Sequence, residues 1–300
     1  METWILIAVA AAFFQNLRFM LQKVLSAEKL STAGATFSRF VYSAPLVWVL
    51  VLVYSGRFDL ELPKLSASFW GYALVGGLSQ VLATLCVVAL FKHRNFAVGI
   101  TLKKTETLLS VLVGFIFLGD LISLGGFTAI LLGLVAVLLL ADTPDGTGTL
   151  AQRVMNRATG LGLGAGLLFA FSAVFYRGAT LALITDDTLL RAALTLACVT
   201  TSQAISMALW LRWREVGQIS KVLRNWRTAG LVGVTSMAGS LCWFIAFSLQ
   251  NAAYVKAVGQ IELVFSFMAS TLFFRETVTR REIAGIVILC AAIVGLILWK

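Results

Sequence analysis

The sequence is poor in the residues on which soluble enzymes depend. One histidine and three prolines occur in 300 residues, and 13% of the residues are charged, whereas a soluble protein carries about 25%. The chain also lacks the H-E-x-x-H and G-x-S-x-G motifs that mark metalloprotease and hydrolase sites. We therefore expect that the protein is not an enzyme and that it holds no metal or other cofactor.

Cysteine is scarce as well. The four cysteines, Cys86, Cys198, Cys242 and Cys290, all fall in the middle of apolar segments. In that setting a cysteine acts as a small apolar packing residue. Their placement argues against a disulfide framework and against a metal site.

Apolar residues take the place of the missing charge. They make up 59% of the chain, which has a mean hydropathy of +0.92, and they form blocks of about 20 residues, the length that crosses a hydrocarbon layer. Helices are the default in lipid because they satisfy their own backbone hydrogen bonds. The sequence thus predicts an all-α polytopic membrane protein. Ten transmembrane helices are expected, over residues 3–25, 33–55, 67–91, 96–117, 121–141, 158–184, 188–211, 228–249, 252–274 and 281–299.

The net charge of +10 comes mostly from short loops between these spans. Lys and Arg concentrate after the first, third, fifth, seventh and ninth spans, and the positive-inside rule places those loops in the cytoplasm. This bias puts both termini outside, in a protein that we expect in a bacterial inner membrane. It also explains the charge without nucleic acid, so the expected partners are a small-molecule metabolite and membrane lipids, with a homo-oligomer left open.

A long stretch of the chain occurs twice. Cys86–Asp120 returns 156 residues later as Cys242–Glu276, and the shift matches Glu106 with Glu262. We therefore expect two copies of one unit, over residues 1–141 and 158–300, joined by a polar linker at 142–157. Five spans are an odd number, so the two copies enter the membrane from opposite sides. Such an inverted-topology repeat is typical of secondary transporters.

Each copy carries a glutamate inside an apolar segment, where charge is expensive and usually functional. Lys103, Glu106 and Ser110 share one helix face, and Glu262 and Ser266 share the matching face of the other copy. Two such faces meeting across a pseudo-two-fold axis would bring the glutamates together at mid-depth. Three roles stay open for them: proton coupling, contact with a substrate or ion, and a structural role in which each caps a broken helix or pairs with a lysine.

Other polar side chains lie where an apolar helix does not need them, and such groups usually face a bundle interior or a watery cavity. For a single Ser, Thr or Gln, a packing hydrogen bond is the alternative explanation. We expect Arg18 and Lys104 to extend their charged ends to the membrane surface. The predicted substrate-binding residues are Gln15, Asn16, Arg39, Gln80, Lys103, Glu106, Ser110, Tyr176, Trp243, Lys256, Glu262 and Ser266, with Glu106 and Glu262 as the proton-coupling candidates.

The ten spans, the five-plus-five repeat and the segment from Glu106-Thr107 to Leu118-Gly119-Asp120 resemble the drug/metabolite transporter superfamily, EamA-like branch. The repeat of that family carries a Glu-Pro pair, followed 14 residues after the Glu by an acid in a Leu-Gly-Glu turn. Glu106 and Asp120 keep this spacing, as do Glu262 and Glu276. The proline of the pair is absent from both copies.

The resemblance adds two implications. In the triose-phosphate and nucleotide-sugar branches, a lysine three residues before the Glu contacts an anionic substrate; Lys103 occupies this position, and Lys256 would be the assisting basic residue. The resemblance also implies that both termini lie in the cytoplasm. The Lys and Arg count indicates the opposite, so both orientations stay open.

Together these patterns predict a secondary transporter that moves a small polar metabolite by alternating access. An anionic or zwitterionic solute is expected, because the cations Arg39, Lys103 and Lys256 outnumber Glu106 and Glu262. The alternative is a proton-coupled exporter of cationic or aromatic compounds. A third hypothesis is a membrane signalling or scaffold protein that no longer transports, against which the retained polar groups argue.

Overall fold

The chain folds almost wholly into helices, with no strand in the described ranges. The computed structural model describes residues 3–93, 96–118, 157–250, 252–276 and 279–298, together with the single positions Leu124, Thr128, Leu131, Leu132 and Val135. The elements are α1 (Thr3–Glu28), α2 (Thr32–Phe58), α3 (Ala67–Leu90), α4 (Phe96–Lys103), α5 (Glu106–Leu118), α8 (Arg157–Leu181), α9 (Thr188–Arg214), α10 (Gln218–Arg224), α11 (Trp226–Leu249), α12 (Ala252–Val258), η1 (Gly259–Ile261), α13 (Glu262–Met268), η2 (Ala269–Phe273) and α14 (Arg280–Leu298).

Six helices in the described part of the chain are long and apolar enough to cross a membrane: α1, α2, α3, α8, α9 and α11. The shortest of them has 24 residues, or about 36 Å at the α-helical rise, which exceeds the thickness of a hydrocarbon core. They coincide with six of the ten expected spans. The all-helical membrane fold predicted from the sequence is therefore confirmed.

The expected fourth and ninth spans are not continuous helices. The fourth divides into α4 and α5, and the ninth into α12, η1, α13 and the π-helical turn η2. The tenth corresponds to α14, while most of the expected fifth span and most of the 142–157 linker lie outside the described residues. The inverted repeat of ten spans stays a prediction.

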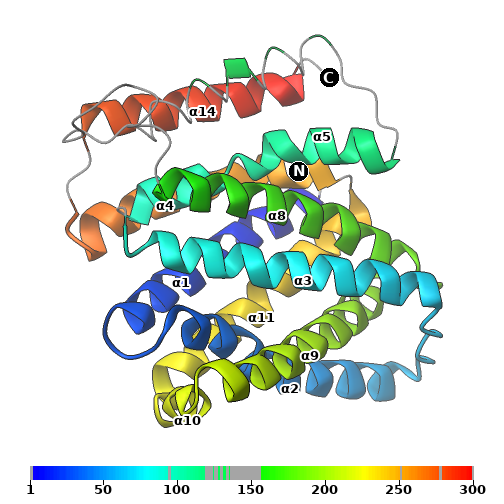
Figure 1. Cartoon of the computed structure of the whole chain (residues 1–300). Coiled ribbons are helices and arrows are strands. Elements are labelled where there is room, and N and C mark those ends of the chain that lie inside the picture. The colour runs from blue at the N-terminus through cyan, green and yellow to red at the C-terminus, as the bar shows by residue number, and fades with distance from the viewer. Residues whose placement is uncertain are drawn as a thin grey trace.

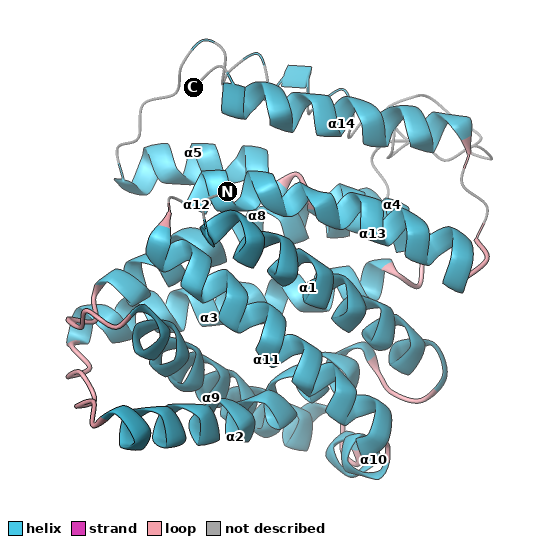
Figure 2. Cartoon of the chain, turned by 180° about the vertical axis from the view of Figure 1, so that it is seen from behind, coloured by secondary structure: helices cyan, strands magenta, loops and turns pink. Residues whose placement is uncertain are grey.

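The long helices pack in pairs that bring distant parts of the sequence together. α3 lies along α8, α1 along α11, and α2 along α9 (Figures 1 and 2). Glycines permit the closest approaches: Gly239 of α11 faces the backbone of Gln15, and Gly76 of α3 faces the ring of Tyr176. Small residues have this role in membrane helices, because close packing supplies the attraction that water exclusion cannot.

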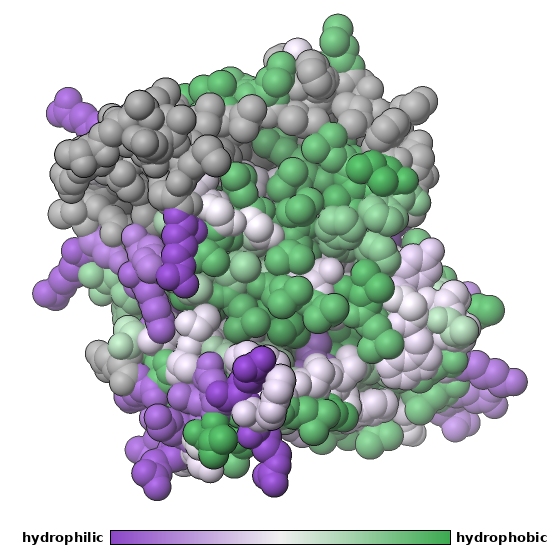
Figure 3. Space-filling view, viewed as in Figure 1, coloured by the Kyte–Doolittle hydropathy of each residue, from purple (hydrophilic) through white to green (hydrophobic). Residues whose placement is uncertain are grey.

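The surface agrees with a position in lipid. Figure 3 shows apolar side chains over the middle of the molecule, with hydrophilic ones gathered at its two ends. Leu74 and Leu78 of α3 and Val49 and Val53 of α2 are among the exposed apolar side chains. A continuous apolar surface of this kind needs a non-aqueous surrounding.

A short helix, α10, connects α9 to α11. Its ends are flanked by the exposed indoles of Trp213 and Trp226, and the guanidinium carbon of Arg214 lies 4.0 Å from the centre of the Trp213 ring. Exposed tryptophans beside basic residues are typical of the membrane–water interface. This end of the protein therefore lies at a membrane surface.

Candidate functional site

The first helix break lies at Lys104 and Thr105, between α4 and α5. The backbone amide of Lys104 donates to Thr101 at 2.9 Å, and that of Thr107 donates to Lys104 at 3.2 Å. These three-residue steps tighten the chain beyond an α-helix. Gly166 of α8 packs against the break: a Cβ atom there would overlap Thr105 Oγ1 and lie 3.2 Å from the carbonyl oxygen of Lys103. Glu106 is the first residue of α5.

The second break lies at Gly259–Ile261, a turn of 3₁₀-helix, and Glu262 is the first residue of the helix that follows. A Cβ atom at Gly259 would overlap the indole of Trp243. Glu106 and Glu262 are 156 positions apart, so the breaks coincide under the shift that relates the two copies of the sequence. Each glutamate therefore begins a helix, where an acid interacts favourably with the helix dipole.

The two breaks meet in a buried set of charges, which we call the lysine–glutamate cluster: Lys103, Lys104, Lys256, Glu106 and Glu262. All five side chains are almost inaccessible to solvent. The Nζ atoms of Lys104 and Lys103 lie 2.6 and 3.2 Å from Glu262 Oε2, and the Nζ of Lys256 lies 3.3 Å from Glu106 Oε2. Each glutamate is thus paired with lysine from the other broken helix, and the ionised cluster carries one excess positive charge.

The two glutamates differ in how well they are satisfied. Glu262 binds two lysines and also accepts a hydrogen bond of 2.9 Å from the Gln15 side chain. Neither carboxylate oxygen of Glu106 has a hydrogen-bond partner among the described residues. Apart from Lys256, its charged neighbours are Lys103 and Lys104, at 3.8 and 3.9 Å. Glu262 is therefore firmly held, whereas Glu106 can exchange partners at a smaller cost.

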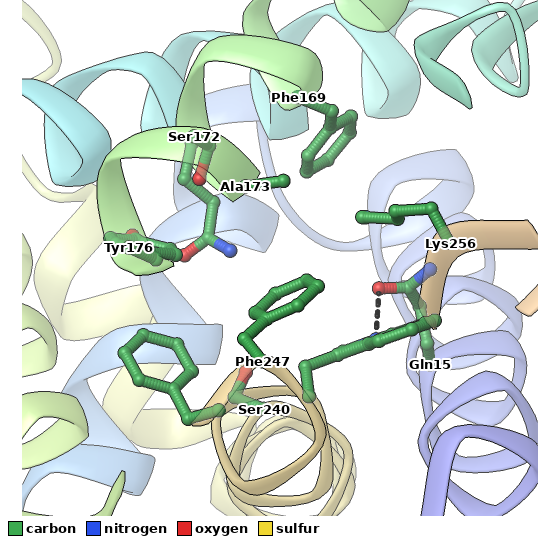
Figure 4. A pocket seen from close by; sticks show the side chains of 11 residues that line it. Gln15, Phe169, Ser172, Ala173, Tyr176, Ser240, Phe247 and Lys256 are labelled. Carbon is green, nitrogen blue, oxygen red and sulfur yellow. Dashed lines mark hydrogen bonds between the residues drawn. The ribbon is translucent and has the colours of Figure 1, made fainter. Parts of the chain in front are cut away.

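Beside the cluster lies a small cavity, the central cavity, with a volume of about 20 Å³. Figure 4 shows side chains of α8 facing those of α11 across it, with Gln15 and Lys256 approaching from one side. None of the described residues that line it is acidic, and Lys256 is its charged group. The lining consists of Gln15, Gln80, Phe169, Ser172, Ala173, Tyr176, Ser240, Trp243, Phe244, Phe247 and Lys256.

Aromatic rings surround the ammonium group of Lys256. Its Nζ lies 4.8 Å from the centre of the Trp243 ring and about 6 Å from those of Phe169 and Phe247. Such ring faces attract a cation electrostatically. The Trp243 indole also donates a 3.0 Å hydrogen bond to Gln15, the dashed line in Figure 4, which links the cavity wall to Glu262.

A second polar group forms the opposite wall. The Tyr176 hydroxyl donates to Gln80 Oε1 at 2.8 Å and accepts from Gln203 Nε2 at 3.2 Å. Gln203 in turn donates to the carbonyl of Gly77 at 2.8 Å. Tyr176 and Gln80 therefore stand in a fixed network, and the cavity has a neutral polar side facing the cationic one.

The structure divides the twelve predicted binding residues into three groups. Gln15, Gln80, Tyr176, Trp243 and Lys256 line the central cavity. Lys103, Glu106 and Glu262 lie in the adjoining cluster. The structure does not bring the other four to the cavity lining: they are Asn16, Arg39, Ser110 and Ser266.

Ser110 and Ser266 fit the alternative explanation, a hydrogen bond made in helix packing. Each hydroxyl donates at 2.8 Å to a backbone carbonyl oxygen of its own helix, that of Thr107 and that of Glu262 respectively. Asn16 is buried and donates weakly to Met20 Sδ at 3.7 Å. Arg39 lies behind Ser240, one layer outside the cavity.

The expectation that Arg18 and Lys104 reach the membrane surface is wrong. Both side chains are fully enclosed. Lys104 turns inward because the helix break points it at Glu262 and at the carbonyl oxygen of Gly259, 3.0 Å from its Nζ. Helical spacing could not reveal this direction, because residues in a break leave the face that regular spacing assigns to them.

Of the α8 and α11 side chains around the cavity, Tyr176 and Trp243 were among the predicted binding residues, whereas the other six were not: Phe169, Ser172, Ala173, Ser240, Phe244 and Phe247. Phe169, Ser172, Ala173 and Tyr176 follow one another at helical spacing on one face of α8. The spacing was visible, yet every apolar helix presents several such faces. The side of α8 that faces the cavity depends on its packing against α3 and α11. Among the described residues, no group of three His, Cys, Asp or Glu side chains comes together to hold a metal.

Comparison with known proteins identifies the class. The EamA-like transporter family matches residues 157–298. A solved structure described only as "Crystal structure of protein" superimposes with a TM-score of 0.65 at 16% identity, over 100% of this chain and 97% of the other, which shows a common fold. The comparison with curated proteins finds no match. The resemblance found in the sequence is confirmed for residues 157–298, which match the EamA-like transporter family, a family of the drug/metabolite transporter superfamily.

Proposed function

We propose that the protein is a secondary carrier for a small anionic or zwitterionic metabolite, which it binds in the central cavity between the halves 1–141 and 158–300. The observation that carries the proposal is the charge of the cavity wall. Lys256 faces the cavity, and none of the described residues that line it is acidic. A cation in a low-dielectric pocket selects an anionic group, since an amine there would face like charge.

The surrounding groups support the same solute. The hydroxyl groups of Ser172 and Tyr176 stand across the cavity from Lys256 (Figure 4), and Gln80, which also lines the cavity, accepts a hydrogen bond from Tyr176. They would orient a second polar group of the solute by hydrogen bonds, as the few polar groups of most ligand pockets do. Glu262 is already engaged by two lysines and Gln15, so it offers little to a cationic solute.

The size of the cavity supports alternating access. A volume of about 20 Å³ has room for one or two water molecules, whereas pockets for organic ligands measure about 300–1,000 Å³. A metabolite can enter only if the helices around the cavity separate. The broken helices α4–α5 and α12–α13 provide points where such movement does not disrupt a continuous hydrogen-bond ladder.

The two glutamates then have different roles. Glu262 holds the lysines of the first break in place. Glu106, bound mainly to Lys256, competes with the solute for that ammonium group. Release of Lys256 from Glu106 as the anion arrives would couple binding to movement of α5 against α12, and proton uptake by the released Glu106 carboxylate would make transport proton-coupled.

The test is uptake into proteoliposomes that contain the full chain. A carboxylate or a phosphate ester should enter faster than an amine of similar size. Lys256→Gln should abolish this preference, whereas Lys64→Gln, in the exposed loop between α2 and α3, should leave it intact. Faster uptake of the amine would overturn the proposal.

One observation favours a second candidate, an exporter of aromatic compounds. The lining includes five aromatic side chains, and the Trp243 and Phe247 rings are stacked with centres 5.8 Å apart. Such walls suit a planar apolar body. An aromatic amine that is taken up in preference to an aromatic carboxylate would establish this candidate instead.

A further inference from the structure

Arg39 of α2 is a buried cation without an acidic partner. Its guanidinium donates to three hydroxyl oxygens: Nε to Ser236 at 3.0 Å, Nη1 to Thr84 at 2.9 Å, and Nη2 to Ser240 at 3.3 Å. No carboxylate among the described residues forms an ion pair with it. Three neutral acceptors compensate a buried charge only in part, because they supply hydrogen bonds but no opposite charge.

Arg18 of α1 is likewise a buried arginine whose hydrogen-bond partner is a neutral side chain. Its Nη1 donates to Gln22 at 3.1 Å, its guanidinium carbon lies 4.0 Å from the centre of the Phe19 ring, and its Nη2 has no hydrogen-bond partner in the described part of the chain. An arginine has five N–H donors. An unused donor on a fully buried guanidinium costs free energy and marks a place where an acceptor is missing.

Hydrogen bonds connect Arg18 with the part of α2 that carries Arg39: Gln22, which accepts from Arg18 at 3.1 Å, donates to the carbonyl oxygen of Ala35 at 3.0 Å, one helical turn from Arg39. The carboxylate of Glu262, one of the buried acids of the bundle, is bound by Lys103, Lys104 and Gln15. Two buried like charges on adjoining helices, neither of them paired with an acid among the described residues, are an unfavourable arrangement. An anion placed between them would remove the repulsion and satisfy the free donor.

We propose that Arg18 and Arg39 form a second anion-binding site, distinct from the central cavity, that takes a carboxylate or phosphate group. The planar fork of a guanidinium matches both groups through paired hydrogen bonds. The inference goes beyond the proposed function, since such a site binds an anion whether or not the chain transports one.

The position of the site connects it with the central cavity. Ser240 lines the cavity and accepts a hydrogen bond from Arg39, so its own proton can be donated to a solute there. Ser236 lies one helical turn further along α11, toward Trp226. Arg18 likewise lies one turn beyond the cavity residue Gln15, toward the loop that joins α1 to α2. The arginines therefore stand on the side of the cavity that leads to this end of the bundle.

Thermal unfolding of the purified full chain, measured with and without inorganic phosphate at constant ionic strength, tests the site. Phosphate should raise the unfolding temperature of the wild-type protein by several degrees, since a ligand that binds the native state stabilises it. Arg39→Gln and Arg18→Gln should each weaken the apparent affinity for phosphate at least tenfold. Arg57→Gln, at the exposed end of the same helix α2, is the matched control and should change nothing.

The same variants distinguish a binding role from a structural one. Without phosphate, Arg39→Gln should unfold at the wild-type temperature or above it, because it removes a buried charge that lacks a counter-ion. A lower unfolding temperature with an unchanged phosphate shift would overturn the proposal, as would a wild-type protein that phosphate does not stabilise. Arg39→Lys, which keeps the charge and loses the fork, should bind phosphate more weakly than wild type and serves if the glutamine variant does not fold.

A phosphate ester of a small alcohol, tested in parallel, identifies the source of the anion. A larger shift from the ester than from inorganic phosphate, reduced by Lys256→Gln, assigns the site to the head group of a solute that reaches into the central cavity. Equal shifts that Lys256→Gln leaves unchanged assign it to a free inorganic anion. In the second case the site stands even if the uptake experiment rejects the proposed carrier function.

Discussion

The two helix breaks occupy equivalent positions in the chain but use different chemistry. At the first, between α4 and α5, two consecutive lysines precede the glutamate by two and three positions. At the second, between α12 and α13, the same positions hold Gly259 and Gln260. The first break therefore contributes lysine side chains, and the second contributes the groups that bind Lys104, namely Glu262 and the carbonyl oxygen of Gly259.

This difference explains why one glutamate is fixed and the other is not. The lysines of the first break cross to Glu262, so that Glu106 is left with Lys256 from the middle of α12. Lys256 also faces the central cavity. The two parts of the lysine–glutamate cluster thus differ: Glu262 is held by two lysines and Gln15, whereas Glu106 is paired with a lysine that lines the central cavity.

Removal of the Glu262 charge should have the largest effect. Glu262→Gln would leave Lys103 and Lys104 buried without their nearest carboxylate, and breaking one side of a buried ion pair costs about 3–5 kcal/mol. Unfolding of the detergent-purified protein by heat should show this loss. Glu61→Gln, in an exposed loop, is the control. An unfolding temperature equal to that of wild type would contradict the structural role of Glu262.

The next largest loss of stability should follow substitution of the glycines that allow close packing at the two breaks. Gly166→Ala and Gly259→Ala would push a methyl group into Thr105 and into Trp243 respectively, and overpacking costs about 1–3 kcal/mol. Gly164→Ala is the matched control on α8. A Cβ atom there meets no atom within 4 Å, and alanine should stabilise the helix by up to about 1 kcal/mol. Equal effects at positions 164 and 166 would disprove the close packing of α8 on the first break.

Glu106→Gln should destabilise the protein less than Glu262→Gln, because the Glu106 carboxylate makes weaker contacts. Its main effect should be on binding. When Glu106 is replaced by a neutral residue, the solute no longer competes with a carboxylate for Lys256. The affinity for an anionic solute should therefore rise about tenfold, or about 1.4 kcal/mol. A titration that follows tryptophan fluorescence, to which Trp243 contributes, measures this change. Weaker binding would show that Glu106 itself contacts the solute.

The smallest effect concerns a neutral contact between the breaks. The Gln260 side chain donates to the Thr107 hydroxyl, and hydrogen bonds between membrane helices contribute about 0.6 kcal/mol on average. Thr107→Val should lower the stability by about that amount in the same unfolding assay. Thr235→Val, whose hydroxyl is exposed and bonded to its own helix, provides the reference. A loss as large as that of Glu262→Gln would mean that neutral contacts, and not charge, hold the breaks together.

Much of the site could be predicted because it depends on local pattern. Charge inside an apolar segment is conspicuous, so Lys103, Glu106, Lys256 and Glu262 were identified directly. A structural role for the glutamates at broken helices was among the alternatives, and the geometry at Glu262 fits it. The directions of Arg18 and Lys104 were predicted wrongly. A lysine or arginine at such a depth can either extend to the membrane surface or pair inward, and the residue type does not distinguish the two.

The sequence by itself determined the class of molecule: apolar blocks of membrane-crossing length, the 156-residue repeat, and the few polar groups that an apolar interior must satisfy. These features follow from composition and spacing, which need no knowledge of neighbouring helices. Only the tertiary structure decided which lysine pairs with which glutamate, and that Lys256 rather than Lys103 faces the cavity. Such pairing depends on the rotation and separation of helices that are distant in the chain, and a difference of one ångström there determines whether two charges form an ion pair.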